Sequence, residues 1–106
     1  MSDERIVVQL PLSGSTDFDE LIDIENALTL AFLKDRAAAV EGHTLSGKAF
    51  NISIAPRADP SAVVDRIKAA LAESGVLDEA LIGTRSTAKE PYSVVWPAGY
   101  KGTLEA

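Results

Sequence analysis

The sequence contains no cysteine and only one histidine and one tryptophan. Without cysteine, the chain has no disulfides, thiolate nucleophiles, iron–sulfur clusters or cysteine-based zinc sites. No apolar run approaches the ~18–20 residues that span a membrane. The polar stretch at residues 1–5 lacks the apolar region of a signal peptide. We therefore expect a cytoplasmic protein with no metal, no cofactor and no membrane partner.

Positive charge is also scarce, because ten Lys and Arg face sixteen Asp and Glu, for a net charge of −6. The basic residues are scattered along the whole sequence. Phosphate backbones and anionic lipid surfaces attract clustered Lys and Arg. The composition therefore predicts no nucleic-acid partner.

The 106 residues, of which 46% are apolar and 25% charged, have the size and composition of one soluble domain. We expect a single domain over residues 1–106, with an irregular tail at 98–106. Asp17, followed three residues later by Glu20, predicts the start of a first helix after a turn at residues 13–16. Asp59 and Pro60 predict the start of a second helix.

Apolar spacing predicts the order of the elements. Strands are expected at residues 5–12, 37–44, 48–55, 80–87 and 92–96, and helices at 17–36 and 59–75. This order, β-α-β-β-α-β with one extra C-terminal strand, is that of a ferredoxin-like α+β fold. Right-handed crossovers then place both helices on one face of an antiparallel sheet.

The pattern over residues 40–99 resembles that of a group of small uncharacterised bacterial proteins. It consists of Gly42-His43, Gly47, Asn51-Ile52-Ser53-Ile54, Asp59-Pro60 and Trp96-Pro97. The resemblance implies a ferredoxin-like fold and attaches no activity to it.

The candidate binding surface is the sheet face that the helices leave uncovered. If Ile6, Val8 and Ile52 pack under the helices, then alternation turns other side chains outward. We expect this polar face to include Gln9, Glu41, His43, Asn51, Ser53 and Arg85. The alternative is a plain solvated face, which antiparallel sheets commonly have.

His43 and Trp96 are the two single-copy side chains with distinctive chemistry. His43 could act as a general base or a metal ligand, but only Glu41 is near it in sequence. Trp96 and Tyr92 are expected to share a strand face and to form an aromatic wall for a ligand or protein anchor. The alternatives are a polar residue near a turn for His43 and core packing for the two rings. We expect no catalytic residue.

Three kinds of function fit these features. The first is a non-catalytic bacterial interaction module, of adaptor or immunity type, that binds another protein or a second copy of itself through the polar sheet face or the edge strands. The second is a small-ligand-sensing domain, and the third a cofactor-free enzyme, each on a ferredoxin-like dimer. Because few groups could serve as acid, base or nucleophile, the sequence favours the interaction module and leaves the other two open.

Overall fold

The computed structural model describes residues 3–12, 17–47, 49–102 and 104, and it confirms the predicted order of elements. The elements are β1 (Arg5–Pro11), α1 (Phe18–Leu33), β2 (Ala38–Ser46), β3 (Ala49–Pro56), α2 (Pro60–Glu73), the short 3-10 helix η1 (Leu77–Glu79), β4 (Leu81–Arg85) and β5 (Ser93–Trp96). The predicted turn at residues 13–16 lies outside the described residues.

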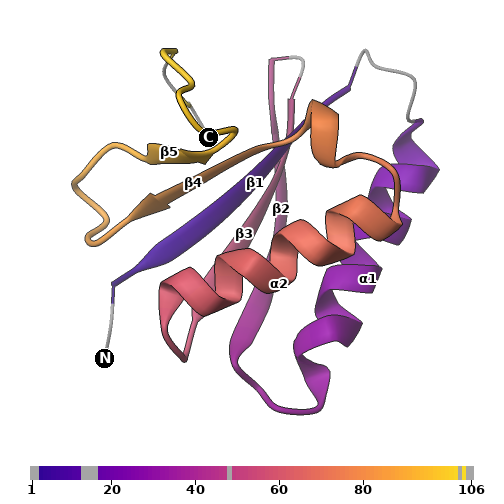
Figure 1. The fold of residues 1–106 in the computed structure, drawn as a ribbon. Helices are drawn as coiled ribbons and strands as arrows, with labels where there is room; N and C mark the ends of the chain where they lie inside the picture. The colour runs from indigo at the N-terminus through magenta and orange to yellow at the C-terminus, as the bar shows by residue number, and fades with distance from the viewer. Residues whose placement is uncertain (1–2, 13–16, 48, 103, 105–106) are drawn as a thin grey trace.

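The sheet has five antiparallel strands in the order β2-β3-β1-β4-β5, and α1 and α2 lie together on one of its faces (Figure 1). This is the ferredoxin-like α+β arrangement, extended by β5 at the edge next to β4. The edges of the sheet are therefore β2 and β5. They differ in length, because β2 has nine residues and β5 has four.

The core fills the space between the sheet and the two helices. Val8 of β1 lies opposite Ile52 of β3 and Ile82 of β4, and all three side chains are fully buried. The helices complete this core with Leu28 from α1 and Ile67 from α2. Strand alternation places Ile6, Val8 and Leu10 of β1 and Phe50, Ile52 and Ile54 of β3 on this face, as predicted, so the intervening residues lie on the opposite face.

Each helix begins close to its predicted start. Asp17 caps α1, because its carboxylate accepts a 2.9 Å hydrogen bond from the backbone N–H of Glu20. Pro60 occupies the first turn of α2, where a backbone N–H has no partner within the helix. In the described part of the chain, neither helix combines the length and the apolar run needed to cross a bilayer.

Candidate functional site

The sheet face opposite the helices carries a hydrogen-bonded chain of polar side chains at its centre. Gln9 lies opposite Asn51, and its amide Nε2 donates to Asn51 Oδ1 at 2.8 Å. Asn51 Nδ2 in turn donates to Ser46 Oγ at 2.8 Å. Asn51 is only 1% exposed. These side chains therefore satisfy one another, and Asn51 is not available to a partner on the surface.

Glu41 lies on the same face, beside β1 and β3. Its Oε1 accepts a hydrogen bond from Arg5 Nε at 2.8 Å, and Ser53 Oγ lies 3.4 Å away. Of the residues predicted for this surface, Gln9, Glu41, Asn51 and Ser53 are thus found together. Their role in binding stays a prediction.

His43 does not share this face with Glu41, so the prediction that alternation keeps them together is wrong. Val40 pairs with Ile54, but Gly42 pairs with Ser53, so Glu41 is an extra residue in β2. Such a bulge reverses the alternation of the strand beyond it. Gly42, at φ 125°, adopts a backbone conformation that glycine tolerates best.

Beyond the bulge, the His43 ring lies on the helix side of the sheet. It stacks on Phe50 with ring centroids 4.6 Å apart, and its Nδ1 lies 3.0 Å from Glu25 Oε1 of α1. Phe18 approaches with its edge, at 6.3 Å between centroids. His43 therefore joins β2 to α1 at the rim of the core.

A second bulge separates Trp96 from Tyr92 at the other edge, contrary to the prediction that they share a face. Trp96 lies opposite Ile82, while Val94 lies opposite Gly83, so Val95 is the extra residue. Trp96 consequently turns to the helix side. Its Nε1 donates to the carbonyl of Leu77 at 3.1 Å, and Lys68 Nζ lies 4.5 Å from its ring centroid.

Arg85 and Tyr92 lie on the face opposite the helices. Arg85 pairs across the strands with Arg5, and its guanidinium carbon is 4.4 Å from the centroid of Tyr92. Arg85 Nε is a buried atom without a hydrogen-bond partner among the described residues.

The C-terminal segment returns over this part of the sheet. Leu104 forms an isolated bridge with Tyr92 and is 5% exposed. A Cβ built on Gly83 would lie 3.1 Å from Leu104 Cδ1, so glycine makes room for this covering. Val7, next to Gly83 in the sheet, is 2% exposed. The expected open polar surface is therefore in part a second, smaller core.

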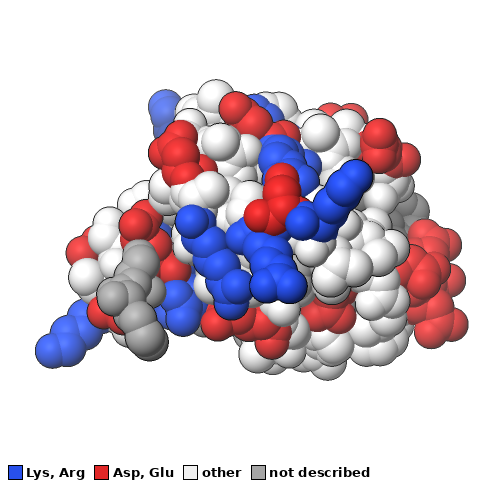
Figure 2. All heavy atoms as spheres, turned by 90° about the horizontal axis from the view of Figure 1, so that it is seen from below, with Lys and Arg blue, Asp and Glu red and all other residues white. Residues whose placement is uncertain are grey.

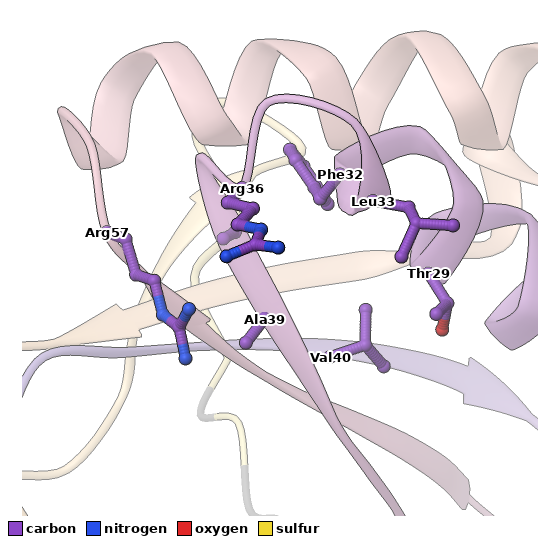
Figure 3. A pocket seen from close by; sticks show the side chains of 8 residues that line it. Thr29, Phe32, Leu33, Arg36, Ala39, Val40 and Arg57 are labelled. Atoms are coloured by element: carbon purple, nitrogen blue, oxygen red, sulfur yellow. The ribbon is translucent and has the colours of Figure 1, made fainter.

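A different site appears at the end of the sheet where α1 joins β2. A hollow of about 270 Å³ is lined by Phe32 and Leu33 of α1, residues 38–40 of β2, and the side chains of Arg36 and Arg57 (Figure 3). Arg36 precedes β2 and Arg57 follows β3. Because Ala38 pairs with Pro56, the hairpin brings the two arginines together.

Sequence reasoning missed this pair, although the predicted hairpin contained the signal for it. The two open ends of an antiparallel hairpin meet, so residues just before the first strand and just after the second are neighbours. Arg36 and Arg57 occupy those positions. Basic residues scattered in the sequence can therefore gather in space, and Figure 2 shows Lys and Arg side chains together in the middle of this end.

No family model matches this chain, and no curated protein or solved structure does either. Among the described residues, no three His, Asp or Glu side chains lie close enough together to hold a metal ion.

Proposed function

We propose that this chain is a non-catalytic interaction module that binds an extended segment of another protein along the free edge of β2. The observation that supports it is the combination of a nine-residue edge strand with exposed apolar side chains beside it. Leu33 of α1, which lines the hollow next to residues 38–40, is 65% exposed. Backbone hydrogen bonds to such an edge supply affinity, and neighbouring side-chain contacts supply specificity.

The bulge in β2 limits how the edge can be used. A β-bulge interrupts regular pairing and protects an edge strand from indiscriminate pairing with other strands. An added segment would pair with the half of β2 on either side of Glu41. The half that begins at Ala38 is the better candidate, because it borders the hollow and Leu33.

The polar sheet face supports binding less well than this edge. Asn51 is buried and bonded to both Gln9 and Ser46, and Glu41 is paired with Arg5. A partner on that face would have to break these contacts or displace Leu104. The edge of β2 requires no such change.

His43 and Trp96, the two single-copy side chains with distinctive chemistry, lie at opposite edges of the sheet. His43 lies at the β2 edge beside Glu25, while Trp96 lies at the β5 edge beside Leu77. The hollow with Arg36 and Arg57 is lined by neither ring. A general base needs a substrate within hydrogen-bond reach, and this separation favours binding over an enzymatic role.

The test is retention of a partner from native lysate by the wild-type chain and by two variants. Leu33→Gln alters the proposed edge, and Val95→Gln alters an exposed apolar side chain at the opposite edge, where Val95 is 43% exposed. Substitutions at such exposed positions usually change the free energy of unfolding by less than about 0.5 kcal/mol, so both variants should fold. We expect a stoichiometric partner that Leu33→Gln loses and Val95→Gln keeps.

Amide hydrogen exchange in the resulting complex supplies the second readout. Strand addition should slow exchange of amides within β2, because their outward N–H groups gain acceptors. Protection confined to β5 or to the sheet face, or equal retention by both variants, would rule out the β2 edge. A dimer of this chain that Leu33→Gln dissociates would show that a second copy, and not another protein, occupies the edge.

A further inference from the structure

The hollow at the start of β2 has two cations at its rim and an apolar floor. Phe32 is 2% exposed and Ala38 is 5% exposed, while Arg36 and Arg57 are both exposed. In Figure 3 the two arginine side chains approach the same space beside Ala39. A group bound there would meet positive charge and apolar surface together.

Neither guanidinium at the rim has a hydrogen bond or ion pair with a described residue. The nearest acid in sequence, Asp35, bonds to other groups. Arg66 Nη1 donates to Asp35 Oδ2 at 2.6 Å, and the backbone N–H of Ala37 donates to Asp35 Oδ1 at 3.2 Å. Two like charges at one hollow repel each other. An anion between them would relieve this repulsion and gain charge-assisted hydrogen bonds.

The backbone around the two arginines is tied together. The N–H of Arg57 donates to the carbonyl of Ala37 at 2.8 Å, and the N–H of Arg36 donates to the carbonyl of Phe32 at 2.9 Å. Arg36 has a φ of 56°, the only positive φ among the described residues other than glycine. A side chain in this left-handed region carries a conformational cost. The connection before β2 and the connection after β3 are therefore joined by a backbone hydrogen bond, which fixes the backbone from which each arginine projects.

The charge around the hollow contrasts with the rest of the chain. The net charge is −6, yet Arg36 and Arg57 belong to this one end together with Arg66, which is paired with Asp35, and Figure 2 shows basic side chains gathered there around an acidic one. Arg66 also lies over Phe32, with its guanidinium carbon 4.6 Å from the ring centroid. Such a local patch in an acidic protein attracts an anionic group to one place on the surface.

We propose, building on the β2-edge function above, that this hollow binds a carboxylate carried by the partner segment. The carboxylate lies between Arg36 and Arg57, and the adjoining apolar part of the segment contacts Leu33 and Val40. The planar guanidinium matches carboxylate geometry through paired N–H donors. Because residues 38–40 are consecutive in β2, the hollow lies along the edge strand and adjoins the path of an added strand.

A second copy of this chain paired along β2 would not supply that carboxylate. In an antiparallel pairing of two β2 edges, the start of one strand would lie beside the end of the other. Residues 44–46 at that end are Thr, Leu and Ser, without an acidic side chain. Charge complementarity therefore favours a different protein. Its carboxylate is either an acidic side chain or a C-terminal carboxylate.

Short acetylated peptides of alternating Val and Thr test the proposal by backbone amide NMR titration of the intact chain. One ends in a free carboxylate, a second in an amide, and a third in an amide with an internal Glu. The first peptide, the third or both should shift the amide resonances of residues 36–40 and 57. A shift with the first peptide indicates a C-terminal carboxylate, and a shift with the third indicates an acidic side chain. Arg36→Gln or Arg57→Gln should weaken that binding about tenfold or more. Lys89→Gln removes an exposed positive charge outside the hollow and should leave peptide binding unchanged.

The possible results separate failure of the carboxylate site from failure of the proposed function. Equal binding of the neutral amide peptide, or binding unaffected at Arg36 and Arg57, would refute the carboxylate site and leave the β2-edge function standing. Hexanoate binding as tightly as the peptides would assign the hollow to a small molecule. If the peptides bind as expected but lysate yields no partner sensitive to Leu33→Gln, the site exists and the proposed function fails.

Discussion

Both edge strands of the sheet contain a β-bulge, but the residues around the two bulges differ. Each edge strand has one extra residue, Glu41 in β2 and Val95 in β5, and each bulge turns a ring toward the helices. At the β5 edge, Trp96 bonds to Leu77 and the C-terminal segment returns to pair with Tyr92. At the β2 edge, His43 lies at the rim of the core, and two exposed side chains lie beside the strand: Leu33, and Arg36, which has no ion pair with a described residue.

The chain covers the β5 edge with its own residues and leaves the β2 edge exposed among the described residues. At β5 the Trp96 ring packs on the helix side and the returning segment packs on the opposite face, and we expect both contacts to contribute to stability. At β2 the strand is longer and its apolar and basic neighbours have no covering segment among the described residues. We therefore expect substitutions at the β5 edge to lower stability and substitutions at the β2 edge to weaken binding.

Replacing the two rings by alanine should show the largest difference. We expect Trp96→Ala to lower the free energy of unfolding by about 3 kcal/mol, because it removes a large, half-buried ring and its hydrogen bond. His43→Ala should cost only about 1 kcal/mol, because the ring is at the exposed rim. Urea denaturation of both variants checks this. Equal costs would mean that the two edges are equally packed.

The returning segment gives a second comparison between the edges. Leu104→Ala should cost about 2 kcal/mol, because Leu104 is 5% exposed over Gly83 and Tyr92. Leu45→Ala, at the end of β2 where Leu45 is 56% exposed, should be close to neutral. Thermal or urea unfolding measures both. A neutral Leu104→Ala would show that the C-terminal segment does not close the β5 edge.

Arg36→Gly should separate stability from binding at the β2 edge. Glycine relieves the cost of a φ of 56° but adds chain entropy in the unfolded state. We expect the free energy of unfolding to rise by about 0.5 kcal/mol while binding of the carboxylate peptides weakens. Arg57→Gly is the matched control, since Arg57 is not at a positive φ; it should weaken binding without a gain in stability. A loss of stability in Arg36→Gly would argue that the side chain holds the loop together.

The smallest expected effect is at Asp35, which is exposed. The backbone N–H of Ala37 and then the charge of Arg66 hold the pKa of Asp35 below its ordinary value of 3.8. A lowered folded-state pKa means that the carboxylate stabilises the fold above that ordinary value, and that this contribution disappears as pH falls through the folded-state pKa. Asp35→Asn should therefore be slightly less stable than wild type near neutral pH and equal to it in acid.

Unfolding midpoints at neutral pH and below pH 3.8 compare Asp35→Asn with wild type. Arg66→Gln keeps the Ala37 hydrogen bond, so the part of the pH dependence that this bond causes should remain. A difference between Asp35→Asn and wild type that grows toward acid would contradict the assigned direction of the pKa.

Most of the fold was predictable because its signals are local and repeated. Alternating residues in β1 and β3, the Asp17 cap and Pro60 predicted the order of the elements, and topology rules then placed both helices on one face. The distribution of candidate residues between the faces was less predictable. A single extra residue reverses a strand's alternation, so His43 and Trp96 were each assigned a neighbour that lies on the other face.

The sequence by itself determined the class of fold, the face of β1 and β3 that packs under the helices, and the absence of cysteine chemistry, because composition and apolar periodicity control which elements form and which faces they bury. Only the tertiary structure decided that Gln9 and Asn51 hydrogen-bond to each other, that Leu104 covers Gly83, and that Arg36 and Arg57 line the same hollow. Each of those facts joins residues far apart in the chain. Their contact depends on strand register and on two bulges, which pairing between strands sets and local propensity does not.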